Sequence, residues 1–296
     1  MQPYFKGVVV AVLGGDTREV ILARRLADAG ALVRVVGLPV ECCKGIGICP
    51  DIPSGLAGAK AVILPVPGIN DRGELYTAFS DRPLVLSGEL LSRLPPGTPV
   101  LTGVARKNLI EMVSQCGLRL VEVMKLDEVA ILNSIPSAEG AIQLAMEHST
   151  ITIHGSRSFV LGFGRTGITL ARKLAALSSK TTVVARNPAQ RARAVEMGLE
   201  SVDFPTFEAQ AAGADFLFNT VPAMVLDQRV LSRVSPAALI IDLASSPGGT
   251  DFKAAERLGI RAILAPGLPG KVAPRTAGEI LAEVVPRILM EELALR

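Results

Sequence analysis

The segment Gly162-Phe163-Gly164-Arg165-Thr166-Gly167 has the spacing G-x-G-x-x-G, the most informative pattern in the chain. A hydrophobic run at 159–161 precedes it, and the apolar spacing after it is helical. In that context the first glycine permits a tight turn, the second lets a pyrophosphate approach the backbone, and the third lets helix and strand pack closely. The helix N-terminus then holds the phosphates. We expect a dinucleotide-binding loop; the alternative is a glycine-rich turn without a ligand.

The end of the next expected strand indicates which dinucleotide is bound. NAD sites place an acidic residue there, on the ribose hydroxyls, but this chain has Ala185-Arg186-Asn187-Pro188, followed by Arg191. A guanidinium can bind a 2′-phosphate through two charge-assisted hydrogen bonds. The sequence therefore predicts NADP, with Arg186, Asn187 and Arg191 at the cofactor. The alternative is that Arg186 only caps the edge of the sheet.

Two further segments follow hydrophobic strands and are expected at the cofactor. They are Asn219-Thr220-Val221-Pro222 and Asp242-Leu243-Ala244. Carboxyl ends of parallel strands form the ligand edge of such sheets, so the nicotinamide and its ribose should lie there. Asp242 is also a candidate catalytic residue, and an ordinary strand-end cap is an equal alternative.

The segment 266–278 is rich in Gly and Pro and is expected to form a rigid loop, with Thr276 as the cap of the last helix. Lys271 and Arg275 are its cations and are candidates to bind a carboxylate; Lys271 is also a catalytic candidate. The alternative is a pair of solvated cations. In the first half, Gly14-Gly15-Asp16 follows a strand without the remaining glycine spacing, so we expect it to line a small-substrate site rather than bind a dinucleotide.

No metal site is expected. Cys42, Cys43 and Cys49 cluster without a C-x-x-C spacing, and His148 and His154 lie far away in sequence, so reduced thiols are the simpler interpretation. Four other cations of the first half are expected at the surface rather than at a ligand, namely Arg72, Arg106, Lys107 and Lys125.

Strand-like runs alternate with helical patterns, which predicts an α/β protein with two Rossmann-like domains. The second is expected to be a doubly wound parallel sheet. Expected strands lie at 8–13, 32–36, 61–64, 84–86, 100–102, 118–123, 159–161, 181–185, 201–204, 216–219, 239–242 and 261–264. The expected domains are 1–133, a hinge helix over 134–150 with Ser137 as its N-cap, and a dinucleotide-binding domain over 151–276; helix 277–296 should pack back on the first domain.

The composition excludes several classes of function. Hydrophobic residues make up 49% of the 296 residues, aromatic residues only 4%, and Trp is absent, as is typical of parallel sheets covered by helices. A net charge of +3 gives no indication of nucleic acid or of a membrane surface. The first apolar run is too short for a signal peptide or a membrane span, so we expect a cytoplasmic protein.

Several segments together resemble the A subunits of bacterial dipicolinate synthase, over essentially the whole chain. They are the Gly14-Gly15-Asp16 opening, Asn133-Ser134-Ile135-Pro136-Ser137-Ala138-Glu139-Gly140, the glycine loop at 161–167, and the Leu-Pro-Gly-Lys-Val-Ala-Pro-Arg-Thr-Ala-Gly segment at 268–278. The glycine loop is shared with many dehydrogenases, whereas the second and last segments are much more specific.

The resemblance implies a role in spore formation, in the mother cell of a spore-forming bacterium. Enzymes of this family oxidise the dihydrodipicolinate-level product of the lysine pathway to pyridine-2,6-dicarboxylate, using NADP and a flavoprotein-like B subunit, so a hetero-oligomer is expected. Oxidation creates an aromatic ring, so the protein must mainly bind a dicarboxylate and align it. The residues expected at that substrate are Ser137, Glu139, Lys271 and Arg275, with Glu139 orienting a cation or capping the helix.

Three alternatives are compared with the residues, which argue against the first two and leave the third open. A 2-hydroxy acid dehydrogenase needs a histidine held by a carboxylate, and neither His148 nor His154 is suitably placed. A shikimate- or methylene-tetrahydrofolate-type dehydrogenase needs a catalytic lysine pattern that the first half lacks. A cofactor-binding scaffold, whose partner performs the chemistry, agrees with the absence of an obvious acid–base residue.

Overall fold

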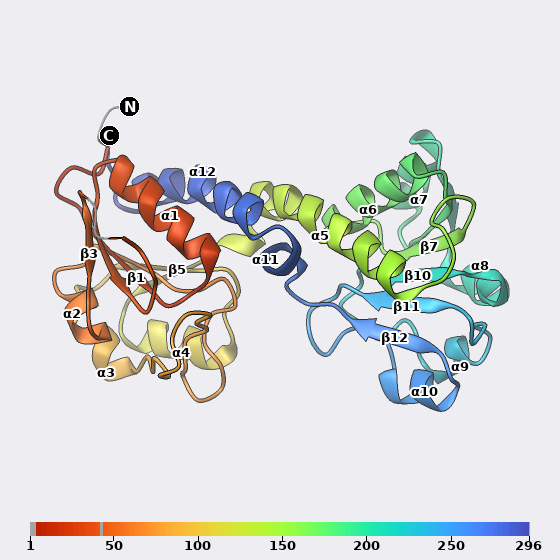
Figure 1. Cartoon of the computed structure of the whole chain (residues 1–296), viewed down its shortest axis with the longest axis horizontal. Helices are drawn as coiled ribbons and strands as arrows, with labels where there is room; N and C mark the ends of the chain where they lie inside the picture. Colours follow the sequence, from red (N-terminus) through yellow and green to blue (C-terminus); the bar gives the residue numbers. More distant parts are fainter. Residues whose placement is uncertain (1–3, 42–43, 296) are drawn as a thin grey trace. The chain divides into compact units, whose positions relative to one another are not determined.

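The computed structural model describes residues 4–41 and 44–295. It divides into two compact units, Met1–Ala130 with Pro274–Arg296, and Ile131–Ala273. Each unit is an α/β structure built on a parallel sheet (Figure 1). The expected fold class, with two Rossmann-like sheets, is therefore confirmed.

The sheet of the first unit has the order β3-β2-β1-β4-β5-β6, with every neighbouring pair parallel. Its strands are β1 (Val9–Leu13), β2 (Leu32–Val36), β3 (Ile46–Ile48), β4 (Ala61–Ile63), β5 (Pro99–Thr102) and β6 (Arg119–Glu122). Its helices are α1 (Thr17–Asp28), α2 (Ile52–Leu56), α3 (Gly88–Leu91), α4 (Lys107–Gln115), η1 (Val123–Lys125) and α12 (Pro274–Glu292).

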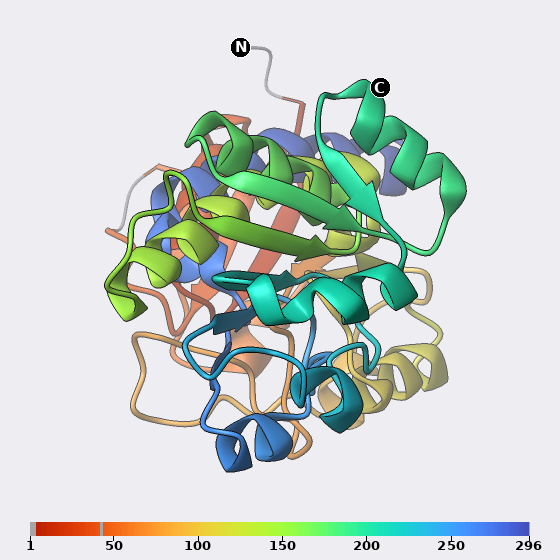
Figure 2. The same ribbon diagram turned by 90° about the vertical axis from the view of Figure 1, so that its right-hand side faces the viewer.

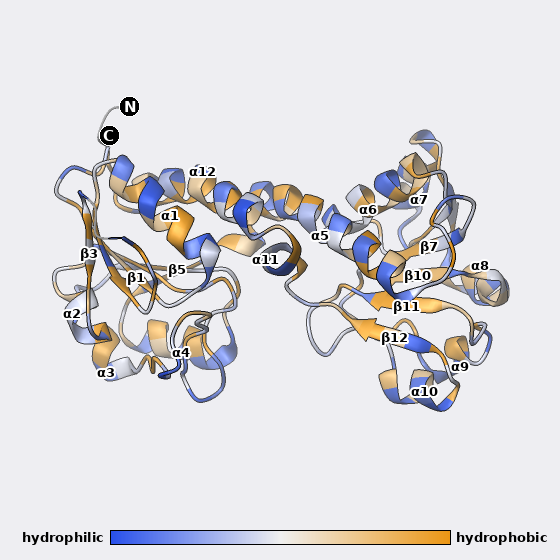
Figure 3. Ribbon diagram, in the orientation of Figure 1, coloured by the Kyte–Doolittle hydropathy of each residue, from blue (hydrophilic) through white to orange (hydrophobic). Residues whose placement is uncertain are grey.

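The central strands of this sheet are buried because helices cover them, and Figure 3 shows them as hydrophobic while α1 and α12 alternate in character. Helix α12 packs on α1 at a small residue. A Cβ on Gly278 would come within 2.8 Å of Ile21 Cδ1 and 3.1 Å of Arg18 Cα. The last helix therefore joins the first unit through a contact that needs glycine.

The sheet of the second unit has the order β12-β11-β10-β7-β8-β9, again parallel throughout, and helices lie on both of its sides (Figure 2). Its strands are β7 (Arg157–Leu161), β8 (Lys180–Val184), β9 (Glu200–Val202), β10 (Phe216–Asn219), β11 (Leu239–Asp242) and β12 (Arg261–Leu264). Its helices are α5 (Asp127–His148, begun in the first unit), α6 (Arg165–Ala176), α7 (Pro188–Glu196), α8 (Phe204–Gln210), η2 (Ala211–Gly213), α9 (Gln228–Leu231), α10 (Phe252–Arg257) and α11 (Leu268–Val272).

The hinge helix differs from the expectation. Helix α5 begins at Asp127 rather than near 134, and Pro136 lies inside it. Ser137 is therefore not an N-cap; its hydroxyl donates to the Asn133 carbonyl one turn earlier, at 2.8 Å. Proline usually marks a helix boundary, but here the helical pattern of the surrounding residues outweighs that local preference.

The structure differs from the expected elements at four other places. Residues 84–86 form no strand, only an isolated antiparallel bridge between Glu74 and Val85. Strand β3 was missed because it is short and contains Gly47. Thr276 does not cap the last helix, since α12 already begins at Pro274, and part of the expected 266–278 loop forms α11. Proline at the first helical position loses no intrahelical hydrogen bond.

Within residues 4–41 and 44–295, no helix is long and apolar enough to cross a membrane. The same residues contain no group of three or more His, Cys, Asp or Glu side chains that could hold a metal ion. Cys49 and Cys116 are free thiols. Cys42 and Cys43 lie outside the described residues.

The packing predicts a large effect of one aromatic truncation. Phe207 of α8 is fully buried, and its ring centroid lies 5.2 Å from that of Phe159 in β7. Phe207→Ala should lower the free energy of unfolding by about 3–5 kcal/mol, because the surroundings cannot refill the cavity. Urea unfolding followed by circular dichroism measures this. Phe79→Ala, at a residue that is 47% exposed, is the matched control and should change stability by less than about 0.5 kcal/mol. Equal effects of the two variants would contradict the packing.

Candidate functional site

A pocket of about 370 Å³ opens at the carboxyl edge of the second sheet. It lies where the strand order reverses, between β7 and β10, which is where open α/β sheets bind ligands. Its lining residues are Gly162, Phe163, Gly164, Arg165, Thr166, Ala185, Arg186, Asn187, Gln190, Phe204, Thr220, Val221 and Pro222. The fold thus brings most of the residues expected at the cofactor into one cavity.

The glycine loop has the geometry that its spacing predicts. Gly162 adopts φ +92°, and a Cβ there would lie 2.6 Å from Thr220 Oγ1. A Cβ on Gly167 would lie 2.1 Å from the Gly162 carbonyl oxygen, so only glycine lets α6 approach the turn this closely. A Cβ on Gly164 would meet nothing within 4 Å and would project into open space. The first and third glycines therefore serve packing, and the second leaves room beside the backbone.

The N-terminus of α6 is free of side-chain caps. The N-cap residue is Gly164, so the first turn of α6 receives no hydrogen bond from an N-cap side chain. The N–H groups of such a turn, with the positive end of the helix dipole, attract phosphate oxygens. The open space beside Gly164 and these N–H groups fit the diphosphate of a dinucleotide.

The cations after β8 play different parts. Arg186 is exposed and lines the pocket, and its guanidinium forms no ion pair or hydrogen bond with any described residue. Arg191 does not line the pocket, because its Nη1 donates to the carbonyls of Ala185 and Arg186 at 2.9 and 2.8 Å. Asn187 caps α7 by accepting from Ala189 N. Arg191 is thus better placed to hold the strand end than to bind a phosphate.

Three lining residues were not among those expected at the cofactor, namely Ala185, Gln190 and Phe204. Gln190 lies on α7 one turn after its cap at Asn187, so helical spacing from the cap could have indicated it. Phe204 begins α8 directly after β9, at the same carboxyl edge of the sheet as the glycine loop.

Asp242 is fully buried and satisfied by neutral donors. Its carboxylate accepts hydrogen bonds from Asn219 Nδ2, the backbone N–H groups of Ala244 and Gly249, and the Thr250 hydroxyl, at 2.7–3.0 Å. Asn219, also fully buried, bonds in addition to the N–H and carbonyl of Val221. A carboxylate that is buried and hydrogen-bonded in this way holds the loops in place. The arrangement favours the role of a strand-end cap over a catalytic role for Asp242. Leu243 and Ala244 do not line the pocket.

The residues expected at the substrate are not gathered in the dinucleotide pocket. Glu139 is exposed and forms an ion pair with Lys173 at 2.8 Å. Lys271 is exposed on α11 of the second unit. Arg275 belongs to the first unit, is exposed, and pairs with Glu279 one turn along α12 at 2.8 Å.

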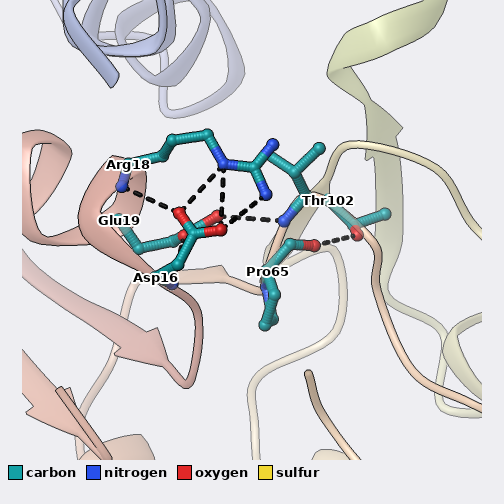
Figure 4. Close-up of polar contacts among 6 residues, drawn as sticks. Asp16, Arg18, Glu19, Pro65 and Thr102 are labelled. Atoms are coloured by element: carbon teal, nitrogen blue, oxygen red, sulfur yellow. Dashed lines mark hydrogen bonds and ion pairs between the residues drawn. The ribbon is translucent and has the colours of Figure 1, made fainter. Parts of the chain in front are cut away.

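The first unit carries a buried charged cluster just after β1, made of Asp16, Arg18 and Glu19 (Figure 4). Asp16 caps α1 and accepts two hydrogen bonds from Arg18 Nε, at 2.9 and 3.2 Å, and one from Arg18 Nη2, at 2.8 Å. Glu19 reaches back to Asp16 N at 2.8 Å and accepts from Val66 N, in the loop after β4, at 2.9 Å. The cluster thus ties the β1 and β4 loops together.

Burial and pairing act differently on the two carboxyl groups. Burial disfavours ionisation of Asp16, but the hydrogen bonds from Arg18 outweigh it and lower the pKa of Asp16. Burial raises the pKa of Glu19 to about 7, because the attraction of Arg18 and the hydrogen bonds from the backbone N–H groups of Asp16 and Val66 offset it only in part. Sequence reasoning singled out Asp16 but not Arg18 or Glu19.

The first unit has a pocket of its own, of about 440 Å³, which is lined by parts of the 67–83 loop and by Arg106. Arg106 is exposed and pairs with Asp71 at 3.0 Å. Arg72, Lys107 and Lys125 are exposed as well. The four cations therefore lie at the surface, as their types suggested.

Comparisons with known proteins agree with this architecture. The family described as the N-terminal domain of the dipicolinate synthase A subunit matches residues 9–124, and that described as D-isomer specific 2-hydroxyacid dehydrogenase, NAD binding domain, matches 136–247. The second unit is thus a nicotinamide-dinucleotide-binding domain of the dehydrogenase type. A transhydrogenase structure from Sinorhizobium meliloti, 15% identical over 97% of this chain and 94% of its own with a TM-score of 0.69, shares the fold.

Two relatives are similar along nearly their whole length. The A subunit of dipicolinate synthase from Bacillus subtilis is 42% identical over 287 residues, which are 96% of this chain and 97% of the relative. The crystal structure of the corresponding dipicolinate synthase chain from Bacillus halodurans matches with a TM-score of 0.92 and 39% identity, over 96% of this chain and 98% of that one. The chain therefore belongs to the family of dipicolinate synthase A subunits.

Proposed function

We propose that this chain is an NADP-dependent dehydrogenase that oxidises a dihydrodipicolinate-level intermediate of the lysine pathway to pyridine-2,6-dicarboxylate during sporulation. The observation that carries the proposal is the dinucleotide pocket, with its open glycine loop and an arginine where NAD sites have an acid. The name of the relatives, dipicolinate synthase, supports the product.

The reaction removes a hydride and a proton from the ring, and the ring becomes aromatic. A bound nicotinamide dinucleotide supplies the hydride acceptor. This chain's residues hold that group: N–H groups of the α6 N-terminus bind the diphosphate, Arg186 binds the 2′-phosphate, and Asn219 with Asp242 keeps the 219–222 segment in place. Lys271 and Arg275, with Ser137 and Glu139, stay our candidates near the substrate. Because aromatisation drives the reaction, the proton can leave to solvent without a strong base.

A cofactor-binding chain whose partner performs the chemistry is a second candidate. The described lining of the dinucleotide pocket contains no Asp, Glu, His, Lys or Cys. His148 contacts Arg261 at 2.9 Å, and His154 precedes the amino end of β7, so neither lies at the carboxyl edge. The relatives are by name one subunit of a synthase, which supports a partner, and we propose that this partner is the flavoprotein-like B subunit.

Turnover separates the two candidates. The purified chain, NADP and freshly made lysine-pathway intermediate should give nicotinamide reduction at 340 nm and pyridine-2,6-dicarboxylate by mass spectrometry. If the chain is the dehydrogenase, product forms without the B subunit, whatever further rate the partner adds. Product only when the B subunit is present, with NADP binding by the isolated chain intact, would favour the scaffold.

Cofactor preference tests the role of Arg186. Arg186→Ala should weaken NADP binding about tenfold or more, because a charged hydrogen bond contributes about 1.5–3 kcal/mol, and should barely change NAD binding. Fluorescence titration of NADPH and NADH measures both. Arg193→Ala is the matched control, since Arg193 lies on α7, which begins just after Arg186, pairs with Glu196 and does not line the pocket. Equal losses for the two cofactors in Arg186→Ala would contradict the assignment.

The glycine loop can be tested without disturbing the fold. Gly164→Val should abolish binding of both cofactors, because its side chain would occupy the open space that the diphosphate needs. Its melting temperature should stay close to the wild-type value, since a Cβ there meets no protein atom within 4 Å. Normal NADPH binding by a folded Gly164→Val protein would show that the loop is only a turn.

A further inference from the structure

The two sheets reverse their strand order at corresponding places. In the second unit the reversal lies between β7 and β10 and holds the dinucleotide pocket; in the first it lies between β1 and β4. Such a reversal separates the loops after the two strands and leaves a crevice at their carboxyl ends. In the first unit those loops carry Asp16, Arg18 and Glu19 after β1, and Val66 after β4. The buried cluster therefore occupies the position where this type of sheet binds a ligand.

This position in the first unit cannot hold a diphosphate as the second one can. The Asp16 side chain accepts a hydrogen bond from Arg18 N, so the helix N-terminus is already capped. The Glu19 side chain folds over Gly15, where a Cβ would lie 2.5 Å from Glu19 Oε2. A ligand here must therefore be recognised by a side chain rather than by open backbone N–H groups.

Arg18 is the side chain that can do so. Its Nε and Nη2 bond to Asp16, and its Nη1 has no hydrogen-bond acceptor among the described residues; in Figure 4 that nitrogen points away from the Asp16 carboxylate. The side chain is only 8% exposed, so it is held in one orientation. Nη1 nevertheless keeps some solvent exposure. Among the described residues, Glu292 Oε2 is the one fully buried side-chain N or O atom that makes no hydrogen bond.

We propose that Arg18 binds one carboxylate of the dicarboxylate substrate through its free Nη1 edge, as the anion site of the first unit. The inference rests on the proposed function and names a residue for its substrate. A guanidinium nitrogen only donates, so the group it binds must be an acceptor, and a carboxylate makes the stronger, charge-assisted bond. Asp16 is a positioning residue, since it holds the guanidinium by its other edge.

Glu19 makes this binding depend on pH. Asp16 already balances Arg18, so an ionised Glu19 gives the cluster one net negative charge, which opposes an incoming carboxylate. Apart from Glu19 itself, the small cavity beside Glu19 is lined by uncharged residues, which come from the β4 and β5 regions, α1, η1 and α12. Besides Asp16 and Glu19, the titratable group that acts on Arg18 is Tyr76. Burial raises the pKa of Glu19 to about 7, so the group is mostly protonated below that pH and ionised above it. Carboxylate binding should accordingly weaken as pH rises through about 7.

The probe for the experiment is pyridine-2,6-dicarboxylate itself, titrated by calorimetry into the full chain saturated with NADP. For the wild type we expect binding to be strongest below about pH 7 and to weaken by up to about tenfold per pH unit above it. Arg18→Gln should weaken binding about tenfold or more at the lower pH, since a charged hydrogen bond is lost. Arg24→Gln, at an exposed position on the same helix, is the matched control and should bind as the wild type does.

Two further measurements keep the test decisive. Arg18→Gln leaves a buried Asp16 without its cation, so the double variant Asp16→Asn with Arg18→Gln supplies a neutral pair if the single variant does not fold. Proton uptake, from titrations in buffers of different ionisation enthalpy, needs no variant: above about pH 7 the wild type should take up protons on binding, and Glu19→Gln should not.

The outcomes separate this inference from the function it rests on. A wild-type chain that binds no pyridine-2,6-dicarboxylate at any pH contradicts the proposed function. If the wild type binds it, but a folded Arg18 variant binds equally well, the inference is overturned while the proposed function stands. Binding without any proton uptake overturns the part assigned to Glu19.

Discussion

The close approach of Gly167 to the Gly162 carbonyl is the constraint on which the second unit depends. A Cβ at Gly167 would lie 2.1 Å from that oxygen, so α6 can turn directly out of β7 only with glycine at this position. The approach places the uncapped N-terminus of α6 at the reversal between β7 and β10. Both the open backbone beside Gly164 and the pocket around it follow from this packing, and so does the possibility of binding a diphosphate there.

Each unit organises the carboxyl edge of its sheet with a buried aspartate, but the partners differ. Asp242 is satisfied by an amide, two backbone N–H groups and a hydroxyl, all neutral, so it makes a rigid frame and leaves no free donor. Asp16 accepts hydrogen bonds from a backbone N–H group of its helix and from the side chain of Arg18. The guanidinium of Arg18 has more N–H donors than those that bond to Asp16. The first arrangement can only support neighbouring loops, whereas the second leaves donor capacity at the same edge.

The sequence predicts what short-range spacing controls. The glycine loop, its strand and its helix follow one another directly, so the pattern carries the geometry, and the two-sheet fold follows from the alternation of strands and helices. Arg191 shows where spacing no longer decides the structure. Its position suggested a phosphate ligand, but the choice between a ligand and the Ala185 and Arg186 carbonyls depends on how α7 is oriented after its cap, which no spacing encodes.

Other parts of the site depend on contacts between distant segments and were missed for that reason. Glu19 lies against Val66, in a loop 47 residues further along the chain, so the burial that raises its pKa depends on that distant segment. Phe204 reaches the dinucleotide pocket because β9 pairs beside β8, not because of any motif around it. The expected helix start at Pro136 and Ser137 was wrong for the opposite reason. These residues look locally like a helix start, but the helix is set by the packing of the whole 127–148 segment.

The two arginines proposed to bind anions differ in burial, and the interactions that would select their ligands differ for that reason. Arg186 is exposed, so its attraction for a phosphate is screened by water and salt, and selectivity there must come from the geometry of paired hydrogen bonds. Arg18 is almost fully buried, so its interactions are stronger, but its charge is already neutralised by Asp16. A buried ion pair can therefore bind a further anion only if a neighbouring group gives up negative charge. Glu19, whose ionisation is disfavoured by burial beside that pair, is the group in the cluster able to do so.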